Sequence, residues 1–222
     1  MKKLIPFAIV LIIVFTQCRT MNLAELNPQG KIAPLLPALE VEFDIYSLEK
    51  NFPDRFNSQT SITSTNMEVT SQSINISNIK NEDVTPNDFI TLFNREVKNN
   101  ITNPYGEKRG KIVCRIAGKD ENPTYILRLL SILSLGTLNI LGMPFDINKN
   151  IIDIDVEIIN NNDELIGRYN AMGKGKEISS LYYGNHYLRA KRYANIKAYK
   201  AAMTNIKKQI EADYKRLIED LE

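Results

Sequence analysis

The residues that could do chemistry in this chain are few and scattered. His186 is the only histidine, so a triad or a zinc site built on any other imidazole is excluded. It stands in LYYGNHYLR, at the start of a long amphipathic segment, where we expect a capping or packing role. Asp153, Asp155 and Glu157 alternate with isoleucine and valine, which is typical of the solvated face of a strand. We therefore predict no catalytic residue, no metal site and no cofactor.

Two basic features could bind an anionic ligand, but the evidence for such binding in the sequence is weak. GKGK at 173–176 lacks the spacing of a phosphate-binding loop, because Glu177 follows where serine or threonine is needed. The chain carries 28 basic and 26 acidic residues, and this near balance gives no reason to expect nucleic acid as a partner. A basic run opens the last segment, and we expect a solvated helix face there, with anionic lipid contact as the alternative: Arg189, Lys191, Arg192, Lys197 and Lys200.

The two cysteines have different surroundings. Cys114 lies in KIVCRIA, where alternation places it on one strand face with Ile112 and Ile116, and we expect it to be buried in the core. Cys18 ends an apolar stretch at the amino terminus. Lys2 and Lys3 precede that stretch, which covers residues 4–15 and is shorter than the roughly 20 residues that a spanning helix needs.

This amino terminus resembles the signal of bacterial lipoproteins over residues 1–18. In that family the cysteine receives a diacylglycerol thioether and becomes the first residue of the mature chain. Gln17 departs from the pattern, because a small residue usually precedes the cysteine. An ordinary cleaved signal and an uncleaved anchor are the alternatives.

The resemblance implies a layout and a location. Residues 1–17 would be the signal peptide, Cys18 the lipidation site that carries fatty acids such as palmitate, and residues 18–37 a flexible tether. The protein would then lie in the bacterial cell envelope, held to the membrane by its lipid. Arg19 is not the aspartate that retains some lipoproteins at the inner membrane, which favours the outer membrane, facing the periplasm.

Residues 38–222 are expected to form one domain. Strands are predicted at 38–46 and around Cys114, a helix at 86–101, and a long polar loop or weak edge strand at 57–82. Residues 150–176 form a predicted hairpin in which Ile154 faces Tyr169 and Asp155 faces Arg168. From about residue 185 to the end, apolar residues recur at steps of three and four, which predicts one long helix of roughly 55 Å. Part of its apolar stripe should then reach a partner, a second copy or residues 124–145.

A second apolar run, at residues 129–145, carries no charge. We expect an apolar helical insert at about 124–146, either buried or lying at a membrane interface, with a docking surface for a partner and a true span as alternatives. The candidate contact residues for a partner or membrane are Leu129, Leu130, Ile132, Leu133, Leu135, Leu138, Ile140 and Leu141.

These elements predict an α+β fold, a mostly antiparallel sheet with helices on one face and a long C-terminal amphipathic helix. Their order resembles that of small envelope accessory lipoproteins, such as activators of peptidoglycan synthases, the periplasmic part of the curli secretion lipoprotein and auxiliary subunits of envelope transporters. No functional residue is carried over from this resemblance. It implies a non-enzymatic scaffold that acts through protein–protein contacts or self-association. A periplasmic carrier of lipid or another apolar ligand is the alternative, and a hydrolase ranks last.

Overall fold

The computed structural model describes residues 30–53, 86–122, 124–182 and 184–221. Its centre is a four-stranded sheet in the order β1-β2-β3-β4. The strands are β1 (Glu40–Phe43), β2 (Gly110–Glu121), β3 (Asp146–Asn160) and β4 (Leu165–Ser179). β1 runs parallel to β2, and the other neighbours are antiparallel. The predicted α+β class with a mostly antiparallel sheet is confirmed.

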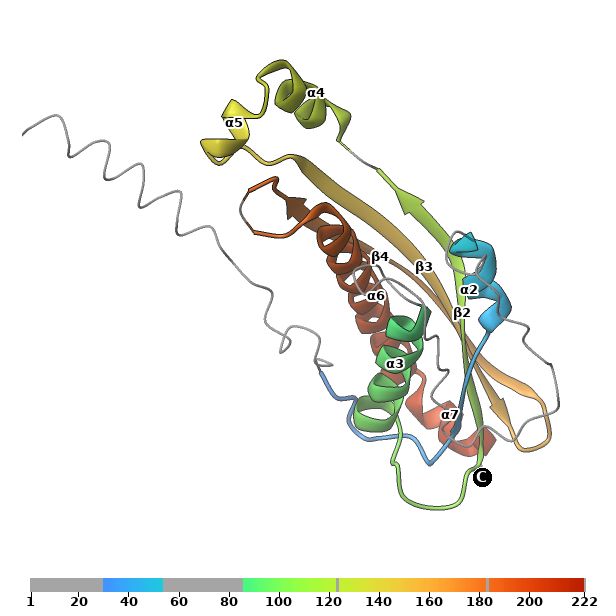
Figure 1. Cartoon of the computed structure of the whole chain (residues 1–222). Coiled ribbons are helices and arrows are strands. Elements are labelled where there is room, and N and C mark those ends of the chain that lie inside the picture. The colour runs from blue at the N-terminus through green and yellow to red at the C-terminus, as the bar shows by residue number, and fades with distance from the viewer. Residues whose placement is uncertain (1–29, 54–85, 123, 183, 222) are drawn as a thin grey trace, which may run out of the picture.

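Helices cover one face and one end of this sheet (Figure 1). The long helix α6 (Tyr187–Ala212) lies along β3 and β4, and α7 (Tyr214–Leu221) follows it. Helix α3 (Pro86–Glu96) continues into the π-helical turn η3 (Val97–Ile101), which confirms the helix predicted at 86–101. α3 lies beside α6. Helix α2 (Ile45–Asn51) borders β2. Helices α4 (Tyr125–Leu133) and α5 (Thr137–Ile140) lie beyond one end of the sheet.

The core is a layer of alternating apolar side chains between the sheet and α6. Ile112 pairs with Ile158, and Cys114 pairs with Val156, so these side chains share the covered face. All are fully buried, which confirms the packing role expected for Cys114. Burial raises the pKa of the Cys114 thiol well above its ordinary value.

The hairpin of β3 and β4 has the predicted faces but a different register. Tyr169 pairs with Val156 instead of Ile154, and Arg168 pairs with Glu157 instead of Asp155. The shift is by two residues, which returns every side chain to its original face. An irregularity between Ile158 and Ile159 displaces the strands at the turn, and the alternation of residue types carries no information on that.

The predicted single C-terminal helix is wrong at one point, because Asp213 interrupts the helix between α6 and α7. The expectation that its stripe extends beyond the sheet is also wrong. α6 measures about 39 Å over 26 residues, whereas β3 has 15 residues and measures about 50 Å. Since α6 lies along the strands, its whole stripe, including Ile196, Met203 and Ile210, packs on the sheet.

The GKGK segment has a structural explanation. Gly173 and Gly175 lie on β4 under the backbone of α6, and a Cβ at Gly175 would stand 2.6 Å from the amide nitrogen of Ala198 and 2.8 Å from the carbonyl carbon of Ala194. Small residues recur on the facing side of the helix at steps of four: Ala190, Ala194, Ala198 and Ala202. Glycine against alanine thus lets the helix and the strand approach closely.

Residues 30–37, the described part of the predicted tether, belong to the folded body. Leu36 is fully buried, and its amide donates to the carbonyl of Ile101 at 2.9 Å. The ammonium of Lys207 binds the buried Glu96 carboxylate and donates to the Gly30 carbonyl at 2.6 Å. Cys18 and the polar stretch at 57–82 lie outside the described residues.

Candidate functional site

The three alternating carboxylates lie on the open face of the sheet and bond to neighbouring side chains there. Asn170 donates to both Asp153 and Asp155 at 2.8 Å. Arg168 lies 3.2 Å from Asp155 and 3.7 Å from Glu157. In the part of the chain that the structure describes, no group of three or more histidine, cysteine or acidic residues could hold a metal ion. The arrangement fits the ordinary solvated face of a sheet.

The start of α6 holds the other chemical candidates. His186 occupies the N-cap position, where its carbonyl accepts from Ala190 at 2.9 Å, and its exposed side chain makes no capping bond. The predicted solvated basic face is largely wrong, because ion pairs join it to other elements. Those pairs are Lys191–Glu121 at 2.8 Å, Arg192–Asp88 at 2.7 Å and Lys197–Glu177 at 2.5 Å.

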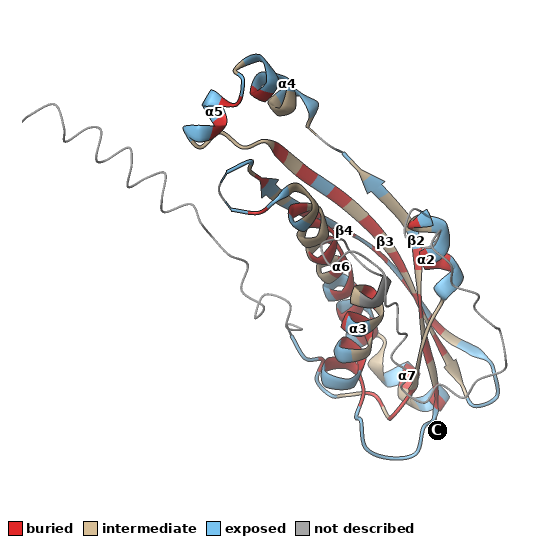
Figure 2. Ribbon diagram, in the orientation of Figure 1, coloured by how far each residue is buried: buried red, intermediate tan, exposed pale blue. Residues whose placement is uncertain are grey.

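The feature that stands out is a group of large apolar side chains exposed at one end of the molecule, which we call the apolar cap. Figure 2 shows α4 and α5 largely exposed on their outer surfaces. Leu135 at the tip is 91% exposed, and Leu133 is 71% exposed. The apolar cap comprises Tyr125, Ile126, Leu129, Leu130, Ile132, Leu133, Leu135, Leu138, Ile140, Leu141, Leu181 and Tyr182.

A reversal between two short helices builds the apolar cap. α4 has nine residues and α5 has four, and the chain turns between them through Leu135 and Gly136, both with positive φ. Glycine adopts such a φ without strain. The Tyr182 hydroxyl, from the loop between β4 and α6, lies beside Gly136, where an added Cβ would stand 3.3 Å from it.

Asp146, at the start of β3, fastens α4 to the sheet. Its carboxylate is fully buried, accepts from the Thr124 amide at 3.2 Å and binds the guanidinium of Arg128 through Nε at 3.0 Å. The guanidinium also lies 4.8 Å from the centre of the Tyr187 ring. Burial disfavours the charge of Arg128, but the hydrogen bonds to Asp146 and Tyr187 outweigh it and raise the pKa of Arg128.

A polar layer separates the apolar cap from the core. On the face that packs against α6, the apolar residues of β3 begin at Ile152, and the positions before it are Asp146, Asn148 and Asn150. Asn150 donates to Asn195 of α6 at 2.6 Å. Among the described residues, the hydrophobic core contains none from 117 to 151. The apolar cap is therefore no continuation of the core.

All eight contact residues predicted from the sequence are exposed in the apolar cap. Within the described ranges, no helix combines the length and apolar character needed to cross a bilayer. The alternative of a true span is wrong, since α4 and α5 return the chain to β3, which pairs with β2. Burial of the run inside the protein is wrong as well, because the polar layer closes the core below it.

Sequence reasoning missed two parts of this site. Leu181 and Tyr182 join the apolar cap from a loop far along the chain, and their only signal is the apolar character of LYY next to a glycine. The Asp146–Arg128 pair had no signal, because the two residues are separated by the whole apolar run. No model of a known protein family matches the chain, and no curated protein matches it.

Proposed function

We propose that this chain is a non-enzymatic, lipid-anchored accessory protein of the bacterial cell envelope that works by holding a contact surface. The apolar cap carries the proposal. Large exposed apolar patches are uncommon on soluble monomers and mark surfaces that meet a protein or a membrane. Here the patch is built from a dedicated hairpin, clamped by Asp146 and lying outside the core.

The lipid anchor rests on the amino-terminal sequence. Lys2 and Lys3, the apolar stretch and Cys18 have the order of a lipoprotein signal. The folded body includes Gly30, which Lys207 holds. Residues 18–29 can extend to at most about 40 Å, so a lipid on Cys18 would keep the body close to the membrane surface. Two or three acyl chains hold such an anchor stably.

The carrier alternative loses the feature on which it was based. A carrier would need the 129–145 run to line a cavity. Leu133, Leu135 and Leu141 instead point away from the body, with exposed fractions of 68–91%. A surface for contact is the simpler reading of such side chains. The scaffold proposal is therefore preferred.

Lipidation is tested by metabolic labelling with an alkyne fatty acid, comparing wild type with Cys18→Ala. We expect label on the wild type alone, together with a mature mass that begins at the lipidated cysteine. Wild type should fractionate with the outer membrane and resist a high-salt wash, and Cys18→Ala should lack the mass of the lipidated chain. An unlabelled wild type that keeps its initiator methionine would refute the anchor.

The contact surface is tested by photo-crosslinking from the apolar cap in intact cells. A photoreactive residue at Ile132 should give adducts with a protein or with lipid. One at the exposed Leu165, at the far turn of the sheet, should give none. Equal yields from both positions, or none from Ile132, would contradict the proposal that the hairpin is the working surface.

A further inference from the structure

The hairpin that forms the apolar cap has the reverse polarity of a water-soluble one. Ser131 and Asn139 are buried between α4 and α5, with exposed fractions of 3% and 2%. The Ser131 hydroxyl donates to the Asn139 side-chain oxygen, and the Asn139 amide donates to the Met143 carbonyl at 3.0 Å. Leucine and isoleucine cover the outside. Polar groups inside and apolar groups outside suit a surrounding of hydrocarbon.

The hydroxyls of Ser134 and Thr137 also bond within the hairpin. The hydroxyl of Ser134 donates to the Ser131 carbonyl at 3.1 Å, and that of Thr137 donates to the Ser134 carbonyl at 2.8 Å. At the turn, the Gly136 amide donates to the Ser131 carbonyl at 2.8 Å. A typical protein interface makes about ten hydrogen bonds across it. This surface offers few groups for such bonds, which favours lipid over a protein partner.

Leu135 has a backbone conformation that is unfavourable for an exposed leucine in water. Its φ is 48°, in the left-handed region where asparagine or glycine is usual and where a bulky residue is strained. It is also 91% exposed, so packing within the chain does little to offset that strain. A leucine here becomes favourable when its side chain enters an apolar medium outside the protein.

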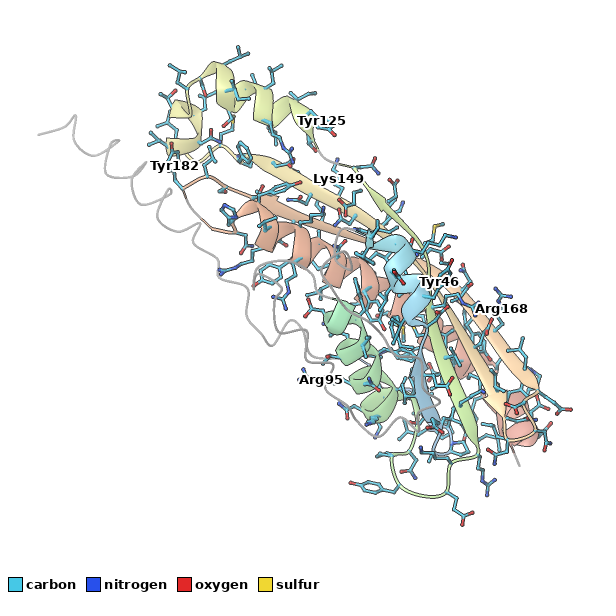
Figure 3. The ribbon with its side chains drawn as sticks, turned by 45° about the vertical axis from the view of Figure 1, so that its right-hand side comes forward. Tyr46, Arg95, Tyr125, Lys149, Arg168 and Tyr182 are labelled. Carbon is cyan, nitrogen blue, oxygen red and sulfur yellow. The ribbon has the colours of Figure 1, made fainter. Side chains whose placement is uncertain are left out.

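Positive charge accompanies the apolar cap at its base. Lys149 and Lys176 are exposed, face each other across β3 and β4, and make no ion pair with any described residue. Lys174 lies exposed two residues away on β4. Like charges that face each other are unfavourable unless an anion shares them. Lys149 lies about 10 Å from Asp146 along β3. Figure 3 shows Lys149 below Tyr125.

We infer that the apolar cap inserts into one leaflet of a phospholipid bilayer, with Lys149, Lys174 and Lys176 on anionic headgroups and Tyr125 and Tyr182 at the boundary. The inference deepens the proposed function, which it needs only for the presence of a nearby membrane. α4 would reach about 14 Å if upright, enough to enter one leaflet and too short to cross the roughly 30 Å of hydrocarbon. Tyrosine favours the membrane–water boundary.

Vesicle flotation of the mature chain with Cys18→Ala tests the insertion without the lipid anchor. We expect it to float with phosphatidylethanolamine–phosphatidylglycerol vesicles. Leu135→Asp should lower partitioning by tenfold or more, and the matched control Leu165→Asp should leave it unchanged. Lys149→Gln should lower binding to these vesicles by roughly fivefold but not binding to phosphatidylcholine. Failure to float with either vesicle would overturn the inference and leave fatty-acid labelling at Cys18 unaffected.

Tryptophan fluorescence gives an independent readout, because the chain has no tryptophan. In Leu133→Trp, vesicles should shift the emission to the blue, and brominated lipids should quench it; Leu165→Trp should show neither change. A blue shift that requires no vesicles and disappears on dilution would show that a second copy covers the apolar cap. Flotation that Leu135→Asp does not reduce would likewise refute insertion.

Discussion

Gly175→Ala tests the close packing of α6 on β4. The added Cβ would lie 2.6 Å from the Ala198 amide nitrogen and 2.8 Å from the Ala194 carbonyl carbon, and closer still to the Ala194 carbonyl oxygen. Ordinary contacts need about 3.5 Å or more, so the helix must retreat by at least about 1 Å to clear the two quoted atoms and further to clear the Ala194 carbonyl oxygen. Every side chain between α6 and the sheet then loses part of its contact, since a gap of that size forfeits about half of the attraction.

We expect Gly175→Ala to lower the free energy of unfolding by about 3 kcal/mol, the upper end of overpacking penalties. For a chain of this size, the melting temperature should fall by about 6–12 °C. The matched control is Gly118→Ala on β2, where the new Cβ would meet the Asp153 Cβ at 3.8 Å, an ordinary contact. The free energy of unfolding of this control should change by no more than about 0.5 kcal/mol. Alanine fits at this position, so the remaining effect is the lower entropy of the unfolded chain.

Urea unfolding followed by circular dichroism measures both variants. The m-value should not change, because the surface exposed on unfolding is the same. If Gly175→Ala unfolds at the same urea concentration as wild type, the added methyl group fits between α6 and β4 without displacing the helix. The proposed seam of glycine against alanine would then be wrong.

Two other predictions concern buried ionisable groups. Lys207→Met leaves the Glu96 carboxylate buried without its cation and should lower the free energy of unfolding by about 3–5 kcal/mol; adding Glu96→Gln should restore most of it, and equal stabilities of the single and double variants would contradict the pairing. Burial raises the pKa of Cys114, Tyr169 and Tyr199. Above the ordinary pKa values of 9.0 for cysteine and 10.0 for tyrosine, the unfolded state therefore releases protons that the folded state keeps, and stability falls. The free energy of unfolding should fall by about 1.4 kcal/mol per pH unit above pH 9, where Cys114 alone contributes, and by about 4 kcal/mol per pH unit above pH 10, where all three groups contribute. Urea titrations at alkaline pH measure this loss, and a flat profile up to pH 11 would refute it.

The elements with a strong period could be predicted from the sequence. Alternation around Cys114 and along 150–158 fixed which side chains are buried, because a strand has only two faces. The apolar residues of 86–101 and of the final segment gave their helices for the same kind of reason. These patterns depend only on which groups avoid water.

What could not be predicted depends on contacts between distant segments. The register of β3 on β4 follows an irregularity next to Ile158 that residue types do not encode. The close packing of α6 on β4 depends on Gly173 and Gly175, which the sequence placed in a hairpin strand without indicating that a helix covers them. Asp146 and Arg128 come together only because β2 and β3 are neighbours.

The same limit explains why the apolar run was ambiguous. Residues 129–145 have the composition of a core helix, and sequence alone does not say where the core ends. The structure ends it at Ile116 and Ile152, with Asn150 and Asn195 bonded to each other beyond that level. Leucines beyond a closed polar layer contribute nothing to the core, so substitutions in the apolar cap should alter binding and leave the melting temperature of the body nearly unchanged. Leu135→Asn separates the two roles most sharply: relief of the positive φ should stabilise the fold slightly, while vesicle binding declines.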